Sequence, residues 1–64
     1  MRLRSKTILA QLKQLVTVTW DGNLLSKDAR DELVRRGLAQ RWNGWNWLTQ
    51  DGVALAEHYK IIKT

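Results

Sequence analysis

Hydrophobic positions in the first third of the chain recur every three to four residues. The recurring set is Ile8, Leu9, Leu12, Leu15 and Val16. This spacing places apolar side chains on one face of a helix, so it predicts an amphipathic helix over residues 7–19. The last turn, residues 17–19, is rich in β-branched side chains, which favour extended backbone. Gly22, in the stretch Asp21-Gly22-Asn23, is expected to end the helix in a left-handed conformation.

A second helical pattern begins after a residue suited to start it. Ser26 is a favoured N-cap, and Asp28 in the first turn suits the helix dipole. The apolar positions that follow are Ala29, Leu33 and Val34. Gly37 can adopt the left-handed conformation that terminates helices, with Leu38 folding back. The pattern therefore predicts a helix over residues 27–36.

The Asn43-Gly44 pair lies between two short alternating runs, which is a strong signal for a β-hairpin. A two-residue turn there predicts strands over residues 39–42 and 45–48, with Trp42 opposite Trp45. Alternation then gives one face made of Ala39, Arg41, Asn46 and Leu48, and another made of Gln40, Trp42, Trp45 and Trp47. The tryptophan face is expected either to pack on a helix of this chain or to meet a partner.

Thr49 is placed to cap a last helix over residues 50–62, which is apolar on more than one side. One inward set is Leu55, Ala56, Tyr59 and Ile62, which leaves Val53, Ala54 and Ile61 uncovered. A two-fold homodimer would bury this remainder, so these three residues are candidate dimerisation contacts. The alternative is a monomer with a few exposed apolar edges.

These elements predict one mostly α-helical domain with a small β-hairpin, in the order α-α-β-β-α. The chain has 64 residues and no cysteine, so no disulfide or thiolate metal site supports its small core. The absence of cysteine is typical of a cytoplasmic protein. No apolar run approaches the roughly 18–20 residues of a membrane helix, so no membrane association is expected.

The net charge of +5 is concentrated near the N-terminus. Residues 1–13 contain four bases and no acid, namely Arg2, Arg4, Lys6 and Lys13. Such an excess predicts a basic arm over residues 1–6 that binds nucleic acid or another polyanion. The alternative is a solvated terminus that aids solubility.

Two motifs flank the predicted hairpin. LVRRGL, residues 33–38, ends a helix on Gly-Leu, and LTQDG, residues 48–52, closes a strand and caps a helix. This order resembles the winged-helix DNA-binding domains of MarR-type and PadR-type regulators over about residues 26–58. The resemblance implies that helix 27–36 enters the major groove of double-stranded DNA and that the hairpin is the wing. It also implies that the last helix serves dimerisation, as in a phage or bacterial transcription regulator.

Candidate site residues follow from charge, position and this resemblance. The candidate DNA contacts are Arg2, Arg4, Lys6, Lys27, Arg30, Arg35, Arg41 and Asn43. Arg30 is expected to point outward from helix 27–36. The alternative for this helix is internal pairing at i,i+4 spacing, as in Lys27–Asp31 and Glu32–Arg36. In a second functional reading, Trp42, Trp45 and Trp47 dock the hairpin on a protein partner.

No catalytic constellation is evident. His58 is the single histidine and has no metal-ligand partner in the sequence. The chain also lacks a nucleophile–base pair, a glycine-rich phosphate loop and carboxylates clustered at catalytic spacing. We therefore expect a protein that is not an enzyme and that needs no cofactor or metal.

Overall fold

The computed structural model describes residues 4–59 of the chain. Three helices and a three-stranded antiparallel sheet make up this part of the molecule. In chain order the elements are α1 (Ser5–Gln14), β1 (Thr19–Trp20), the 3₁₀ turn η1 (Asp21–Asn23), α2 (Lys27–Arg35), β2 (Ala39–Trp42), β3 (Trp45–Leu48) and α3 (Gln50–His58). The mostly helical fold class with a β2–β3 hairpin is confirmed.

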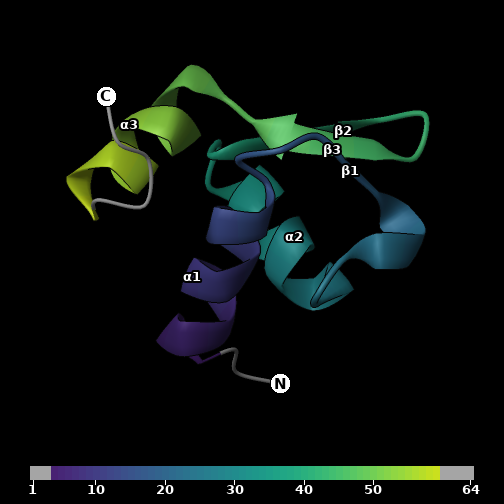
Figure 1. Cartoon of the computed structure of the whole chain (residues 1–64), viewed down its shortest axis with the longest axis horizontal. Coiled ribbons are helices and arrows are strands. Elements are labelled where there is room, and N and C mark those ends of the chain that lie inside the picture. The colour runs from purple at the N-terminus through teal and green to yellow at the C-terminus, as the bar shows by residue number, and fades with distance from the viewer. Residues whose placement is uncertain (1–3, 60–64) are drawn as a thin grey trace.

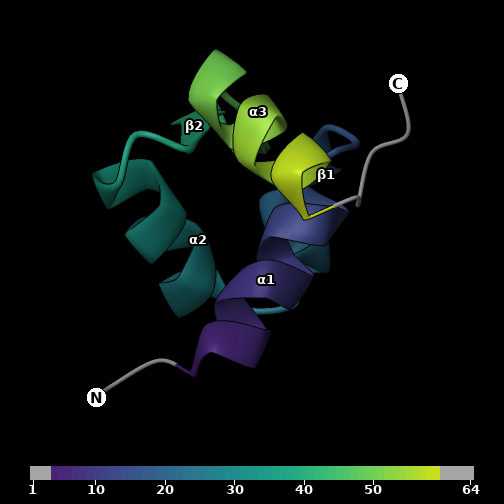
Figure 2. The same cartoon turned by 90° about the vertical axis from the view of Figure 1, so that its left-hand side faces the viewer.

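The sheet has the strand order β1-β3-β2 and lies across one end of the helical layer. Helices α1 and α2 lie on one side of it, and α3 lies beside the end of the sheet away from the hairpin turn (Figures 1 and 2). Over the described residues, no element covers the opposite face. We call this opposite side the outer face of the sheet.

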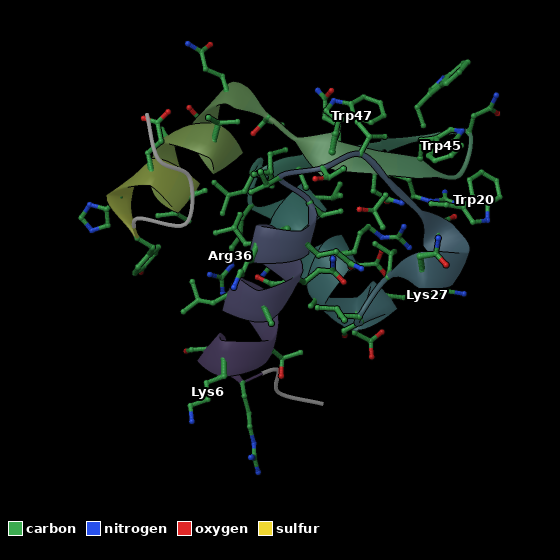
Figure 3. All side chains as sticks on the ribbon, in the orientation of Figure 1. Lys6, Trp20, Lys27, Arg36, Trp45 and Trp47 are labelled. Carbon is green, nitrogen blue, oxygen red and sulfur yellow. The ribbon has the colours of Figure 1, made fainter. Side chains whose placement is uncertain are left out.

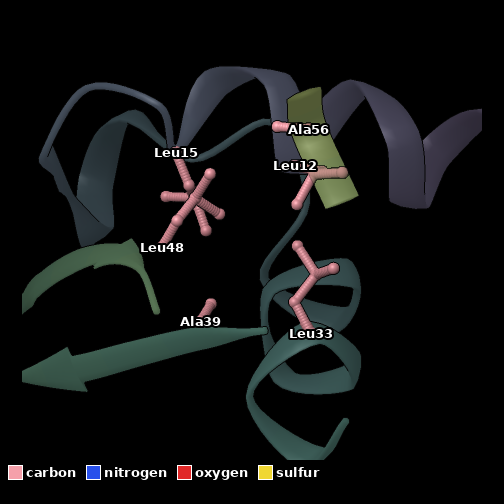
Figure 4. Close-up of a cluster of buried hydrophobic side chains, with 6 residues drawn as sticks. All are labelled: Leu12, Leu15, Leu33, Ala39, Leu48 and Ala56. Carbon is pink, nitrogen blue, oxygen red and sulfur yellow. The ribbon is translucent and has the colours of Figure 1, made fainter. Parts of the chain in front are cut away.

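The hydrophobic core lies where the helices meet the inner face of the sheet. It consists of Leu12, Leu15, Leu33, Ala39, Leu48 and Ala56, all of them buried (Figure 4). Five of them come one each from α1, α2, β2, β3 and α3, and Leu15 directly follows α1, so no single element forms the core by itself. Removing them from water provides the main driving force for the fold.

Both ends of α2 are capped as the sequence predicts. The Ala29 amide donates a 3.1 Å hydrogen bond to the Ser26 hydroxyl oxygen. At the other end Gly37 has a φ of 75°, and the Leu38 amide donates to the Leu33 carbonyl over 2.9 Å. These contacts satisfy backbone groups that a helix end otherwise leaves free. The prediction of a helix over residues 27–36 is thus confirmed to within one residue.

The hairpin is confirmed in its strands, turn and register. Trp42 lies opposite Trp45 and Ala39 opposite Leu48. Asn43 and Gly44 have φ values of 55° and 84°, the positive values that the favoured two-residue hairpin turn requires.

The predicted helix over residues 7–19 is wrong at its C-terminal end. The helix stops at Gln14, and Thr19 and Trp20 instead form a short strand that pairs with β3. The Thr19 hydroxyl donates to the Thr17 carbonyl over 2.7 Å, and the Thr19 carbonyl accepts from the Asn46 side chain over 3.0 Å. The strand ladder and these side-chain bonds replace the last helical turn. Gly22 also differs from expectation, because it lies in η1 and its φ is not positive.

The start of α3 is confirmed, since the Thr49 hydroxyl oxygen accepts from the Gly52 amide over 3.1 Å. The predicted end at residue 62 lies outside the described residues. Val53 packs against the core instead of remaining uncovered, whereas Tyr59, predicted to face inward, is 51% exposed. Within residues 4–59, no helix is long and apolar enough to span a membrane.

Candidate functional site

All four tryptophans of the chain belong to the outer face of the sheet. In the strand register Trp20 and Trp42 both lie opposite Trp45, and Trp47 is two residues further along β3. The alternate residues, Thr19 and Asn46, are buried against the helices. Figure 3 shows Trp47 above the sheet and Trp20 next to Trp45 near the hairpin turn. We call these four residues the tryptophan face.

Three members of the tryptophan face are substantially exposed. Trp42 is 70% exposed, Trp45 47% and Trp20 45%, whereas Trp47 is partly buried. These three rings therefore do not pack on a helix of this chain, because α1 and α2 lie on the other side of the sheet.

The rings near the turn hold one another in place. The Trp20 and Trp45 ring centroids are 5.0 Å apart in an edge-to-face arrangement. The Trp20 ring also lies directly on Gly44, where a Cβ atom would come within 2.5 Å of it. Edge-to-face contact is a favourable geometry for aromatic pairs. These contacts therefore fix the positions of the Trp20 and Trp45 rings relative to each other and to the turn.

Trp20 is a candidate binding residue that the sequence pattern did not reveal. The predicted helix over residues 7–19 ends directly before Trp20, and a residue at the end of that helix is not expected to share a face with the hairpin. The alternating run Thr17-Val18-Thr19-Trp20 carried the available signal, because alternation with β-branched residues is typical of a strand. That signal competed with the helical spacing of the preceding residues.

Beneath the sheet, one carboxylate holds two arginines. Asp21 Oδ1 accepts from Arg30 Nη1 over 2.9 Å, and Asp21 Oδ2 accepts from Arg41 Nη2 over 2.6 Å. Asn46 joins them, since its Oδ1 accepts from Arg30 over 2.8 Å and its Nδ2 donates to Asp21 over 2.7 Å. We call Asp21, Arg30, Arg41 and Asn46 the Asp21 network.

The Asp21 network changes the expectation for two candidate DNA contacts. Arg30 is only 7% exposed, so its predicted outward orientation is wrong. The hydrogen bond and charge of Asp21 raise the pKa of Arg41. In turn the hydrogen bonds from Arg41, Asn46 and Arg30 hold the pKa of Asp21 well below its usual range. Both guanidinium charges therefore have a fixed partner inside the molecule.

The two arginines near the C-terminal end of α2, Arg35 and Arg36, are paired within the helix. Glu32 pairs with Arg36 over 2.6 Å, as the i,i+4 spacing predicts, and also with Arg35. These two arginines lower the pKa of Glu32, with Arg35 contributing most. The predicted Lys27–Asp31 pair does not form, because Asp31 accepts from Arg30 over 2.7 Å instead.

The remaining candidate DNA contacts do not converge. Arg4 and Lys6 are exposed at the start of α1, Lys27 is exposed at the start of α2, and Asn43 is exposed in the turn. Figure 3 places Lys6 at the end of the molecule away from the sheet. Arg2 lies outside the described residues. The structure thus brings together the aromatic candidates and leaves the exposed cations dispersed.

A shallow groove of about 580 Å³ runs along β2, the edge strand of the sheet. Trp42, Trp47 and Gln40 line it on the outer side, and Val34 and Gly37 line it where α2 ends. Among residues 4–59, no three His, Cys, Asp or Glu side chains are grouped to hold a metal ion.

No family model, curated protein or solved structure shows a significant match to the chain. Its function is therefore inferred from its own residues and their arrangement.

Proposed function

We propose that this chain is a small protein-interaction domain that binds a partner protein through the tryptophan face. The single observation that carries the proposal is that all four tryptophans lie on the one side of the sheet that no described element covers. The proposal takes up the second reading of the sequence, in which the hairpin docks on a protein.

Exposed indole rings are unfavourable in isolation and characteristic of binding surfaces. Tryptophan is enriched among the residues that dominate protein–protein binding energy, and clustered apolar exposure marks interaction sites. The exposed fractions of Trp20, Trp42 and Trp45 correspond to roughly 250–400 Å² of ring surface, at 150–250 Å² per ring. A standard interface buries about 800 Å² on each side. The rings thus supply about a third to a half of one side.

The charge arrangement favours a protein over a polyanion at this surface. Binding to nucleic acid depends mainly on cations that neutralise phosphates. Arg41, the cation of the hairpin, is paired with Asp21, and Arg35 at the end of α2 is paired with Glu32. A phosphate would have to compete with these carboxylates, whereas an uncharged protein surface would not.

Selection of peptides on the immobilised chain would test this proposal. From a random peptide library we expect enriched sequences whose binding weakens at least about tenfold in Trp42→Ala, the loss typical of a central aromatic contact. Leu25→Ala is the matched control, because Leu25 is 64% exposed but lies outside the sheet. Failure to enrich any sequence, or equal binding to Trp42→Ala, would refute the proposal.

DNA binding is the second candidate function, and two observations favour it. The order α1-β1-α2-β2-β3, with β1 beside β3 and α2 directly before the hairpin, is compatible with the winged-helix resemblance. The net charge is +5, and Lys6, Lys13 and Lys27 are exposed. In this reading the chain is a phage or bacterial transcription regulator with α2 in the major groove.

Titration with random duplex DNA at 50 and 200 mM salt would separate the two functions. Each phosphate contact adds about −0.9 to the slope of log affinity against log salt. If α2 contacts phosphates, Lys27→Gln reduces the slope by about one contact, and Gln40→Ala, on the sheet, leaves it unchanged. Negligible binding at 50 mM salt would exclude the DNA function.

A further inference from the structure

The groove beside β2 has aromatic walls and no fixed aromatic partner inside it. Trp42 and Trp47 both line it, whereas the edge-to-face contact joins Trp20 and Trp45 outside it. Gln40 neighbours both lining residues in the register, since it is opposite Trp47 and two residues before Trp42 on the same face. The ring surfaces of Trp42 and Trp47 are thus available to a ligand.

The residues that line the groove also carry side-chain hydrogen-bond donors that bond to no other described residue. Within residues 4–59, neither Trp42 nor Trp47 donates its indole N–H to another described residue, and the Gln40 amide makes no side-chain hydrogen bond there. An indole N–H is a donor and never an acceptor. A ligand that covers these rings must therefore bring acceptors, or binding leaves buried donors unpaired at a cost in free energy.

Pairing of an added strand with the edge of β2 does not fit the groove. In antiparallel ladders alternate residues point their backbone groups toward the neighbouring strand or away from it. The Thr49 amide donates a 3.0 Å hydrogen bond to the Leu38 carbonyl, so the backbone groups of Leu38 point toward the neighbouring strand. By alternation, the backbone groups of Ala39 and Arg41 point away from it, toward the free edge of the sheet. Ala39 is only 2% exposed, which leaves a single open residue on the edge.

A helical ligand and an acidic or phosphorylated ligand fit no better. A docked helix presents apolar side chains while its own carbonyls are bonded internally, so it brings few acceptors to the indoles. An acidic ligand needs a free cation, and the one cation in the groove lining, Arg41, is held by Asp21.

A polyproline II segment meets each requirement. It has no internal hydrogen bonds, so its carbonyls remain free to accept, and its rings pack on aromatic side chains. It carries no charge, and its stiffness reduces the conformational entropy lost on binding. We infer that the groove between Trp42 and Trp47 binds a proline-rich partner segment in the polyproline II conformation. This inference rests on the proposed protein-interaction function and identifies its ligand class.

Titration of the full chain with the peptide acetyl-octaproline amide would test the inference. The readouts are tryptophan fluorescence and the indole N–H signals in nitrogen–proton NMR spectra. We expect saturable shifts with octaproline and none with an acetyl-(Gly-Ser)₄-amide peptide of equal length. Trp42→Ala should weaken binding at least about tenfold. Circular dichroism of each variant would establish that the fold is retained.

A matched pair of conservative substitutions isolates the indole donor. Trp42→Phe keeps an aromatic ring but removes the N–H, so we expect binding to weaken about threefold to tenfold, as for the loss of one hydrogen bond. Trp45→Phe makes the same chemical change at a ring of the tryptophan face that does not line the groove, so we expect it to weaken binding less than Trp42→Phe does. Equal losses in the two variants would overturn the assignment to the groove.

The failures of the two proposals are distinguishable. If octaproline gives no saturable shift up to millimolar concentration, or the Gly-Ser peptide binds equally well, the polyproline inference is wrong. Proline-free sequences from the peptide library that depend on Trp42 would then leave the interaction function standing with another ligand class. If the library also gives no Trp42-dependent binder, both proposals fail.

Discussion

Asn46 shows how one residue joins three segments of the chain. Its side chain is fully buried, donates to the Thr19 carbonyl and to Asp21, and accepts from Arg30. It therefore connects β3 with β1, η1 and α2. A buried amide is stabilising only when its polar atoms are bonded, and here each one is.

Replacing Asn46 should destabilise the protein. Asn46→Ala leaves the Thr19 carbonyl and the Arg30 guanidinium without one partner each, so we expect unfolding to become easier by about 1–3 kcal/mol. Urea denaturation followed by circular dichroism would measure this. Gln40→Ala is the control, because Gln40 is exposed on the outer face and its loss should cost at most about 0.5 kcal/mol. Equal stabilities of the two variants would contradict the role of Asn46.

Acid should weaken the fold through Asp21. The pKa of Asp21 is lowered in the folded state, chiefly by its hydrogen bond to Arg41, relative to about 3.9 in an unfolded chain. Such a group stabilises the fold above its unfolded pKa, and this contribution is lost as pH falls through that value toward the folded pKa. We expect the urea midpoint to decrease progressively below about pH 5.

The variant Asp21→Asn separates this effect from other carboxylates. It should be less stable than the wild type at pH 7 and should lose less stability on acidification. Glu32, whose pKa is also lowered, leaves a residual slope of the same sign. Parallel pH profiles for the two proteins would mean that Asp21 does not carry the acid sensitivity.

At the scale of elements, two glycines mark where helices meet the rest of the fold. Gly37 has a φ of 75° after α2, and no atom beyond its two chain neighbours lies within 4 Å of where its Cβ would be. Gly52, in the first turn of α3, has an ordinary φ, but a Cβ there would overlap the Leu38 carbonyl oxygen. The first is required by backbone conformation and the second by close packing of α3 on the chain leading into β2.

The two glycines should respond differently to alanine. Gly37→Ala places a side chain in the left-handed region, so we expect a loss of about 1–2 kcal/mol with no change in structure. Gly52→Ala forces α3 away from Leu38, so we expect a loss above about 3 kcal/mol and shifted NMR signals in α3 and β2. If Gly52→Ala proves the milder substitution, the close contact between α3 and Leu38 is wrong.

At the scale of the whole molecule, the predicted dimer through α3 has lost part of its basis. Of its three candidate contacts, Val53 packs against the core, Ala54 is exposed, and Ile61 lies outside the described residues. The tryptophan face by itself supplies less area than a stable dimer needs.

We therefore expect a monomer of 7.5 kDa at tens of micromolar in sedimentation equilibrium. In a monomer the exposed face of α3 is not an interface, so Ala54→Glu should leave this mass unchanged. A dimer mass in the wild type that falls to the monomer mass in Ala54→Glu would establish the α3 interface instead.

Local features of the sequence were sufficient for the hairpin and for α2. Asn43-Gly44 specifies a turn that few other residue pairs can form, and that turn determines which residues of the two strands lie opposite each other. Ser26 and Gly37 similarly mark the ends of α2 through bonds to residues within five positions of them. The division of the hairpin into a face of Ala39, Arg41, Asn46 and Leu48 and a tryptophan face followed from this register, and the burial of Ala39, Asn46 and Leu48 agrees with it.

Contacts between distant residues could not be predicted in this way. Thr19 and Trp20 become a strand because β3 offers them hydrogen bonds that a last helical turn would not make. Their partners Asn46 and Trp45 are 27 and 25 positions away along the chain. Arg30 is buried because Asp21 and Asn46 converge on it from two other elements. The sequence by itself thus determined the turns, caps and alternation, since these depend on neighbouring residues. Only the tertiary structure decided that all four tryptophans share one open face and that the arginines beneath it are paired, since both depend on segments that meet only when the chain folds.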